Sequence, residues 1–229
     1  MTPIGKHTGK RITKDGSEPV LKELGGLYLV VDPTMPHLEL LDIVQKSLRG
    51  GVDILQLWAP SHDKSGILKL AEALTDLARK YNVPLIINKD VELAKKVGAD
   101  GVHLDEYDLT PTKVRQELGE QSIVGYTMGN DLDKLRWAEN AGADYISFCA
   151  IFPTSTVTQC EIVPINSIKL AKSITKLPVF ASGGINLNNA HLVLEAGADG
   201  IAVISAILKA SDPEQTARSF KEIIRIIRS

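Results

Sequence analysis

One short pattern recurs along the chain and limits the folds that it can form. The segments GGVDILQL, GADGVHL, GADYISF and GADGIAV begin at Gly50, Gly98, Gly142 and Gly197, so successive copies start 44 to 55 residues apart. Each copy follows a run such as LELLDIVQKSLRG, whose apolar residues recur at helical spacing. A glycine at this place is typical of a residue that ends a helix in the left-handed conformation. The pattern therefore predicts repeated units of a helix followed by a buried strand.

Other apolar runs alternate with these copies. GLYLVV, VPLIIN, SIVGYT and LPVFASGG begin at Gly26, Val83, Ser122 and Leu177, which brings the expected strands to eight. Continuous apolar strands that alternate with helices predict a parallel sheet covered by helices. The regular repeat favours one closed (β/α)8 TIM barrel, of the α/β class, over an open sheet. We expect residues 1–25 to be an N-terminal extension and residues 26–229 to form the barrel.

The composition excludes several classes of partner. The chain has 26 basic and 28 acidic side chains, which gives a net charge of -2 and no basic region suited to nucleic acid or to an anionic membrane surface. We find no apolar run of the ~20 residues that a membrane-spanning helix needs. Cys149 and Cys160 lack the spacing of a metal or redox motif, so we expect them to be reduced and the protein to be cytoplasmic.

Polar residues gather where the expected strands end, which is where the active site of a parallel barrel lies. Gly183 and Gly184 follow the seventh strand, and Ile204 and Ser205 follow the eighth. The glycines let backbone N–H groups approach an anion, and the second pair opens a short helix whose N-terminus attracts negative charge. A phosphate cup is therefore expected here, although a simple tight turn remains an alternative. Other candidates at strand ends are Gln56, Trp58, Asn88, Lys89, His103, Thr127, Thr154, Ser155 and Thr156.

The segments LYLVVD, GGVDILQL, VPLIIN, GADGVHL, GADYIS, IFPTST and GADGIAVISAI together resemble thiamine phosphate synthase and its relative, the thiazole tautomerase. The resemblance implies a (β/α)8 barrel that joins hydroxymethylpyrimidine pyrophosphate to hydroxyethylthiazole phosphate with loss of pyrophosphate. It also implies that Gly184, Ile204 and Ser205 bind the thiazole phosphate. Thr154 and Thr156 belong to the same half of the site and match hydroxyl groups that bridge toward the pyrophosphate. Asp108 matches a carboxylate that holds magnesium in this family.

Four positions depart from the synthase pattern. Trp58 and Pro60 stand where the family has an arginine and a lysine that contact pyrophosphate, and Val157 replaces another lysine. Lys89 stands where the family has a magnesium-binding aspartate, while the neighbouring Asp90 is expected to cap the next helix. Magnesium is expected only if synthase activity is retained.

Three functions remain open at this point. The first is a thiamine phosphate synthase of weak or altered activity, in which Lys89, His103 and Thr127 are the catalytic candidates. The second is a related barrel that binds a small phosphorylated heteroaromatic ligand without performing this reaction. The third is the tautomerase, which is disfavoured because Gly129 stands where that relative has its histidine, so that proton transfer would fall to His103, Asp105 or Glu106. A homodimer is possible for each.

Overall fold

The structure is a computed structural model that describes residues 24–58, 64–154 and 161–229. The predictions for Pro60, Ser155, Thr156, Val157 and Cys160 lie outside the described residues, as do residues 1–23 of the expected extension. Within the described parts, no helix combines the length and the apolar character needed to cross a membrane.

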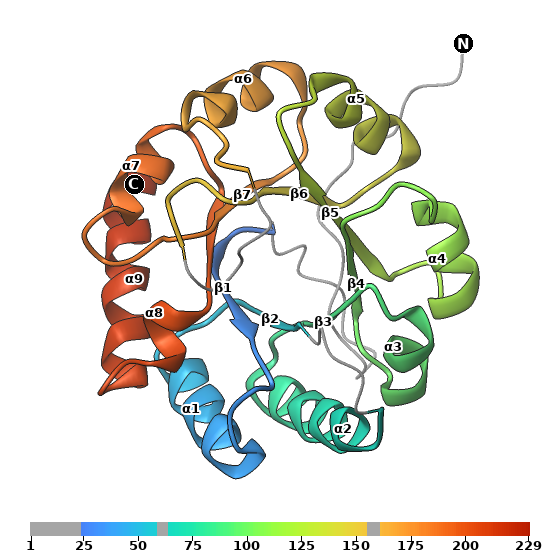
Figure 1. The fold of residues 1–229 in the computed structure, drawn as a ribbon, viewed down its shortest axis with the longest axis vertical. Coiled ribbons are helices and arrows are strands. Elements are labelled where there is room, and N and C mark those ends of the chain that lie inside the picture. Colours follow the sequence, from blue (N-terminus) through green and yellow to red (C-terminus); the bar gives the residue numbers. More distant parts are fainter. Residues whose placement is uncertain (1–23, 59–63, 155–160) are drawn as a thin grey trace.

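Eight parallel strands form a closed barrel, which confirms the predicted fold class (Figure 1). Each strand pairs with its neighbours in chain order, and β1 closes the barrel against β8. The strands are β1 (Gly26–Val31), β2 (Ile54–Leu57), β3 (Leu85–Asn88), β4 (Gly101–Leu104), β5 (Ile123–Met128), β6 (Tyr145–Phe148), β7 (Val179–Ser182) and β8 (Gly200–Val203).

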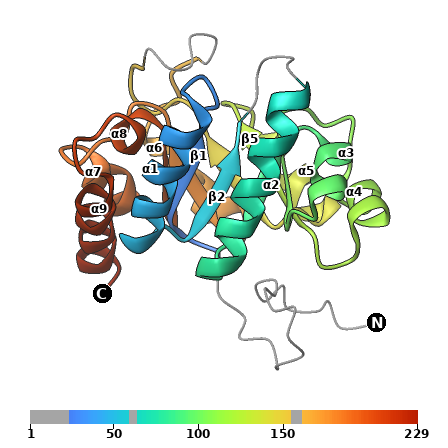
Figure 2. The same cartoon turned by 90° about the horizontal axis from the view of Figure 1, so that it is seen from below.

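Helices surround the strands on the outside (Figures 1 and 2). Figure 2 shows α1, α2 and α9 along the wall of the barrel and the short α8 at its upper rim. The helices are α1 (His37–Arg49), α2 (Lys64–Tyr81), α3 (Val91–Val97), α4 (Pro111–Leu118), α5 (Leu132–Ala141), α6 (Asn166–Ile174), α7 (Ala190–Glu195), α8 (Ser205–Leu208) and α9 (Pro213–Arg228).

The repeated glycines end the helices in two ways. Gly98 and Gly142 are left-handed helix ends, as the sequence predicted. Gly50 is instead right-handed, with φ -73, and the next residue, Gly51, takes the positive φ. A Cβ on Gly50 would lie 2.4 Å from the carbonyl oxygen of Glu214, so this glycine is needed for the close approach of α1 to α9. The left-handed prediction was therefore wrong for Gly50, because close packing, and not backbone conformation, requires a glycine there.

The aspartate of each repeat forms hydrogen bonds that link the start of one strand to the strand before it. The carboxylates of Asp53, Asp100, Asp144 and Asp199 accept hydrogen bonds of 2.7 to 2.9 Å from the backbone N–H of Leu27, Leu85, Val124 and Val179. In each case the aspartate N–H also donates to the carbonyl of the same partner residue. The repeat thus encodes four equivalent clamps at the N-terminal ends of the strands, opposite to the end where the candidate site lies.

We expect Asp144→Ala to lower the free energy of unfolding by about 3 kcal/mol, because it leaves a largely buried partner charge and a backbone donor unpaired. Asp144 also forms a 2.8 Å ion pair with Arg115, and both side chains are less than 15% exposed. Urea unfolding measures the loss. The matched control is Asp133→Ala on α5, whose side chain is 93% exposed and which should change stability little. Equal effects of the two substitutions would contradict the role of the clamp.

Side chains alternate between the inside and the outside of the barrel, as the period of a strand requires. Leu55 and Leu57 of β2 belong to the core between strands and helices, whereas Ile54 and Trp58 belong to a smaller cluster inside the barrel. Tyr28, Tyr145 and Phe180 fill this interior with edge-on ring contacts. These rings form a floor beneath the C-terminal ends of the strands.

Candidate functional site

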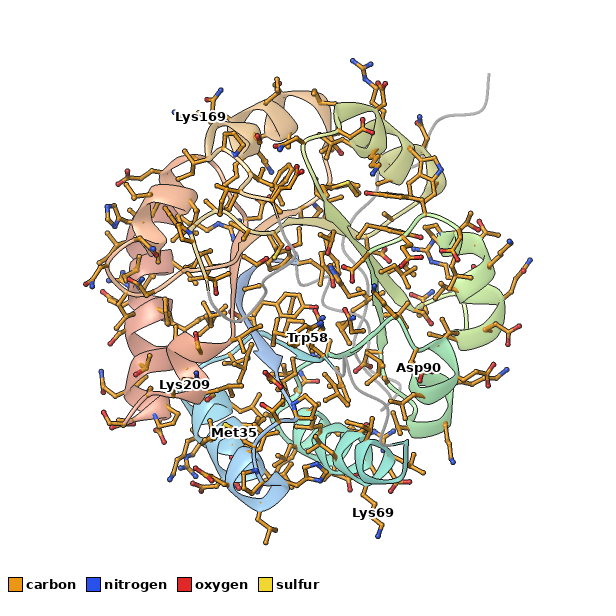
Figure 3. The ribbon with its side chains drawn as sticks, viewed as in Figure 1. Met35, Trp58, Lys69, Asp90, Lys169 and Lys209 are labelled. Atoms are coloured by element: carbon orange, nitrogen blue, oxygen red, sulfur yellow. The ribbon has the colours of Figure 1, made fainter. Side chains whose placement is uncertain are left out.

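A cavity of about 920 Å³ opens above this floor. The residues around it come from the ends of all eight strands and from the loops that follow. They include these predicted site residues: Gln56, Trp58, Asn88, Lys89, His103, Thr127, Thr154, Gly183, Gly184, Ile204 and Ser205. Figure 3 shows Trp58 near the middle of the ring of strands, whereas Lys69 of α2 points outward. The position of Trp58, which the sequence left open, is thus in the cavity.

Asp108 is not among the residues that line the cavity, and its side chain is exposed. Two lining residues that sequence reasoning missed are Tyr28 and Lys209. Tyr28 lies within an apolar strand and gives no sign of its polar contacts. Lys209 follows the short α8 and places a cation beside the β8 loop, a position that only the three-dimensional arrangement reveals.

The loops after β7 and β8, where the sequence predicts a phosphate cup, both line the cavity. Gly183 and Gly184 have φ values of +84 and +67, which favour glycine. Their carbonyls accept from Phe152 N (3.1 Å) and Asn189 Nδ2 (3.0 Å). Within the described residues, the backbone N–H groups of Gly184 and Ile185 have no hydrogen-bond acceptor, so they can serve an anion. Ile204 precedes α8, as expected.

Lys89 lies on the opposite side of the cavity in an unusual backbone conformation, with φ 60. Its N–H donates to the carbonyl of His103 (2.8 Å), and its ammonium lies 3.0 Å from Asp105 Oδ2 and 3.6 Å from Glu106 Oε1. Partial burial alone would lower the pKa of Lys89, but the hydrogen bonds and charges of these carboxylates raise it. Asp90 caps α3 through Leu93 N (2.8 Å), which confirms that it is engaged as a helix cap.

The residues near Lys89 do not fit a magnesium site. Mg²⁺ requires several oxygen ligands in a near-octahedral arrangement. Asp105 already binds Lys89 through Oδ2 and Thr127 through Oδ1, the latter at 2.6 Å. Among the residues that the structure describes, no three side chains of His, Cys, Asp or Glu are grouped so that they could hold a metal ion. Lys89 therefore supplies positive charge where the sequence resemblance expects a metal.

His103 is buried in the floor of the cavity and both ring nitrogens have partners. Nδ1 lies 2.9 Å from the Tyr145 hydroxyl, and Nε2 lies 2.8 Å from the Thr127 hydroxyl. Burial lowers the pKa of His103 to about 4, against the opposing effect of the Asp105 charge and with a smaller contribution from Lys89. The imidazole is consequently neutral at pH 7. A role in general base catalysis would require it to release one of these two contacts.

This pKa predicts how stability depends on pH. The unfolded chain binds a proton at His103 below pH 6.5, whereas the folded chain does so only near pH 4. His103 therefore makes its full contribution to the free energy of unfolding above pH 6.5, and this contribution is lost as the pH falls toward 4. Between pH 7 and pH 5 we expect the protein to lose about 2 kcal/mol more stability than a His103→Gln variant. Parallel urea titrations test this, and identical pH slopes would contradict it.

Comparisons with known proteins agree on one family. The sequence model of the family described as thiamine monophosphate synthase matches residues 27–207. The chain is 39% identical to the thiamine-phosphate synthase of Halorhodospira halophila over 196 residues, which cover 86% of this chain and 92% of that protein. It is 36% identical to the thiamine-phosphate synthase of Methanobrevibacter smithii over 188 residues, covering 82% and 90%.

The chain belongs to the thiamine monophosphate synthase family. A solved structure of thiamine phosphate pyrophosphorylase from Pyrococcus furiosus agrees with this, with a TM-score of 0.77 and 29% identity over 89% of this chain and 97% of that one. Membership connects the chain with thiamine biosynthesis. For a family member, the cavity at the C-terminal strand ends is the candidate substrate site.

Proposed function

We propose that the protein is a thiamine phosphate synthase-type transferase with a strong thiazole phosphate site and a weakened site for pyrimidine pyrophosphate. One observation carries the second part of the proposal. Lys89 is held 3.0 Å from Asp105 at the place where the family pattern calls for a metal ligand, so its charge is already partly neutralised. Family membership, the cup of the β7 and β8 loops and the location of Thr154 support the first part.

In the proposed reaction, the bond between the pyrimidine methylene carbon and the pyrophosphate oxygen breaks, and the electron pair leaves with the pyrophosphate. The lone pair of the thiazole nitrogen then forms the new carbon–nitrogen bond. Gly184, Ile185 and Ser205 would fix the thiazole phosphate, and Trp58 offers a flat apolar face to an uncharged ring. Lys89 would have to leave Asp105 to neutralise the departing pyrophosphate, and this exchange makes the step slow.

Trp58 favours one alternative function. An indole at the cavity wall suits an uncharged ring better than a polyanion, so the barrel could bind a phosphorylated heteroaromatic ligand without performing the condensation. This alternative shares the phosphate cup with the first proposal and differs in the second substrate.

One pair of measurements separates these functions. The purified protein is incubated with both synthase substrates and magnesium, and thiamine phosphate is followed by chromatography; hydroxyethylthiazole phosphate binding is measured by calorimetry. Slow but measurable product together with tight binding supports the transferase. Tight binding with no product above background contradicts it and supports the ligand-binding alternative. Turnover as fast as in a family member that has the complete pyrophosphate pattern would show that the site is not weakened.

A further inference from the structure

A continuous chain of hydrogen bonds crosses the floor of the cavity. It starts at Asp105 and ends at Gln56, and its members come from β1, β2, β4, β5 and β6 and from the loop after β4. The links are Asp105 Oδ1 to Thr127 (2.6 Å), Thr127 to His103 Nε2 (2.8 Å), His103 Nδ1 to Tyr145 (2.9 Å), Tyr145 to Tyr28 (2.9 Å) and Tyr28 to Gln56 Oε1 (2.8 Å). Gln56 Nε2 then contacts Asn88 Oδ1 at 2.9 Å.

The five links from Asp105 to Gln56 each need one hydrogen atom. The three hydroxyl groups supply one each and a neutral imidazole supplies one, which makes four. A carboxylate at one end and an amide oxygen at the other supply none. One link therefore lacks a hydrogen, and two facing lone pairs in a buried site are unfavourable.

Burial alone would raise the pKa of Asp105, but the charges and hydrogen bonds around this carboxyl group lower it, so it holds no proton at neutral pH. Two sources then remain for the missing hydrogen. One is a second proton on His103. The other is a half-turn of the Gln56 amide, which exchanges its oxygen and nitrogen without changing the shape of the side chain and turns an N–H toward Tyr28. Burial lowers the pKa of His103 to about 4, so the ring does not hold a second proton at neutral pH. The amide is then the remaining donor.

We propose that at neutral pH Gln56 donates to Tyr28 and that every hydrogen bond of the chain points toward Asp105, with His103 as its Nε2–H tautomer. Gln56 Oε1 then faces Asn88, so Asn88 donates from Nδ2 and turns Oδ1 into the cavity. The ligand group that lies against Asn88 is consequently a hydrogen-bond donor, such as an amino or hydroxyl group. Tyr28 and Tyr145 are positioning residues that act on the ligand through these amides.

Uptake of one proton by His103 reverses the part of this chain that runs from His103 to Gln56 and Asn88, whereas the links from His103 to Thr127 and Asp105 keep their direction. With both ring nitrogens protonated, Tyr145 donates to Tyr28, Tyr28 donates to the Gln56 oxygen, and Asn88 presents its N–H2 group to the cavity. The charge of Asp105 favours this protonated state, and the charge of Lys89 opposes it.

Two further acidic groups lie near the chain. Glu106 pairs with Lys89, and the charge of Asp144 acts on Tyr145. Burial raises the pKa of Tyr28 and of Tyr145, so both hydroxyl groups retain their hydrogens near neutral pH. The proposal rests on the hydrogen-bond geometry of the cavity and does not depend on which reaction takes place there.

Nitrogen-15 NMR of the histidine-labelled full chain at pH 7 tests the direction of the chain. The His103 signals are assigned by their loss in His103→Gln. We expect a proton on Nε2 and none on Nδ1. A proton on Nδ1, alone or together with one on Nε2, would overturn the proposal, and this measurement needs no variant that alters the cavity.

Gln56→Glu gives a second, independent test, because an ionised carboxylate at the end of the chain cannot donate to Tyr28. The chain must then take up one proton, so at pH 7 either the new carboxyl group or His103 should be protonated, although free carboxyl groups titrate near pH ~4. Carbon-13 and nitrogen-15 spectra locate this proton. An ionised carboxylate beside a neutral His103 would overturn the proposal. The matched control, Gln56→Leu, removes the last link and should leave His103 as the Nε2–H tautomer without proton uptake.

Discussion

The triple variant Trp58→Arg, Pro60→Lys, Lys89→Asp should form thiamine phosphate at least ~100-fold faster than the parent chain. Each charge-assisted hydrogen bond contributes about 1.5 to 3 kcal/mol, so two restored cations supply at least ~3 kcal/mol, and a tenfold change in rate needs about 1.4 kcal/mol. The third substitution removes the ammonium that lies 3.0 Å from Asp105 and adds a carboxylate able to bind magnesium. Product formation under saturating substrates measures the gain.

The control for the third substitution is Lys96→Asp, which makes the same charge change as Lys89→Asp at an exposed position on α3. It should leave the rate unchanged. The triple variant should also become more dependent on magnesium than the parent, because only the variant has the added carboxylate. If the triple variant folds and its rate equals that of the parent, the lost cations are not the cause of weak activity.

The sequence predicted the barrel because its determinants are local. Buried strands and amphipathic helices alternate at a regular spacing, and parallel strands with covered faces have few alternative arrangements. The same repeat contains the aspartates of the strand clamps, but their function could not be read from it. Asp144 accepts from Val124, which lies on the preceding strand, and only the register of the two strands brings them together.

The candidate site was predicted in part for a similar reason. Gln56 and Trp58 share one face of β2 and its extension, so strand alternation places both in the barrel once the register is known. Tyr28 and Tyr145 were missed because a tyrosine in an apolar strand gives no indication of its hydroxyl partners. The contact between these hydroxyls joins residues that are 117 positions apart in the chain. The roles of Lys89, His103, Thr127 and Asp108 remain predictions.

Gly184→Ala should weaken binding of hydroxyethylthiazole phosphate by about 100-fold. A Cβ at this position would lie 2.6 Å from the carbonyl oxygen of Pro153 and 2.7 Å from that of Phe152, so the loop must shift. The shift withdraws the N–H groups of Gly184 and Ile185 from the phosphate, and two charge-assisted hydrogen bonds of about 1.5 kcal/mol each account for the expected loss. Calorimetry at constant ionic strength measures the dissociation constant.

A second glycine separates the effect on the cup from the general cost of a side chain at positive φ. Gly119, at the end of α4, has φ +100, and a Cβ there would meet no atom within 4 Å. Gly119→Ala should therefore carry only backbone strain of about 1 to 2 kcal/mol, visible in urea unfolding, and should bind the ligand as the parent does. If Gly184→Ala also bound the ligand with unchanged affinity, the phosphate would have to lie elsewhere in the cavity, and Lys209 or Lys89 would become its expected partner.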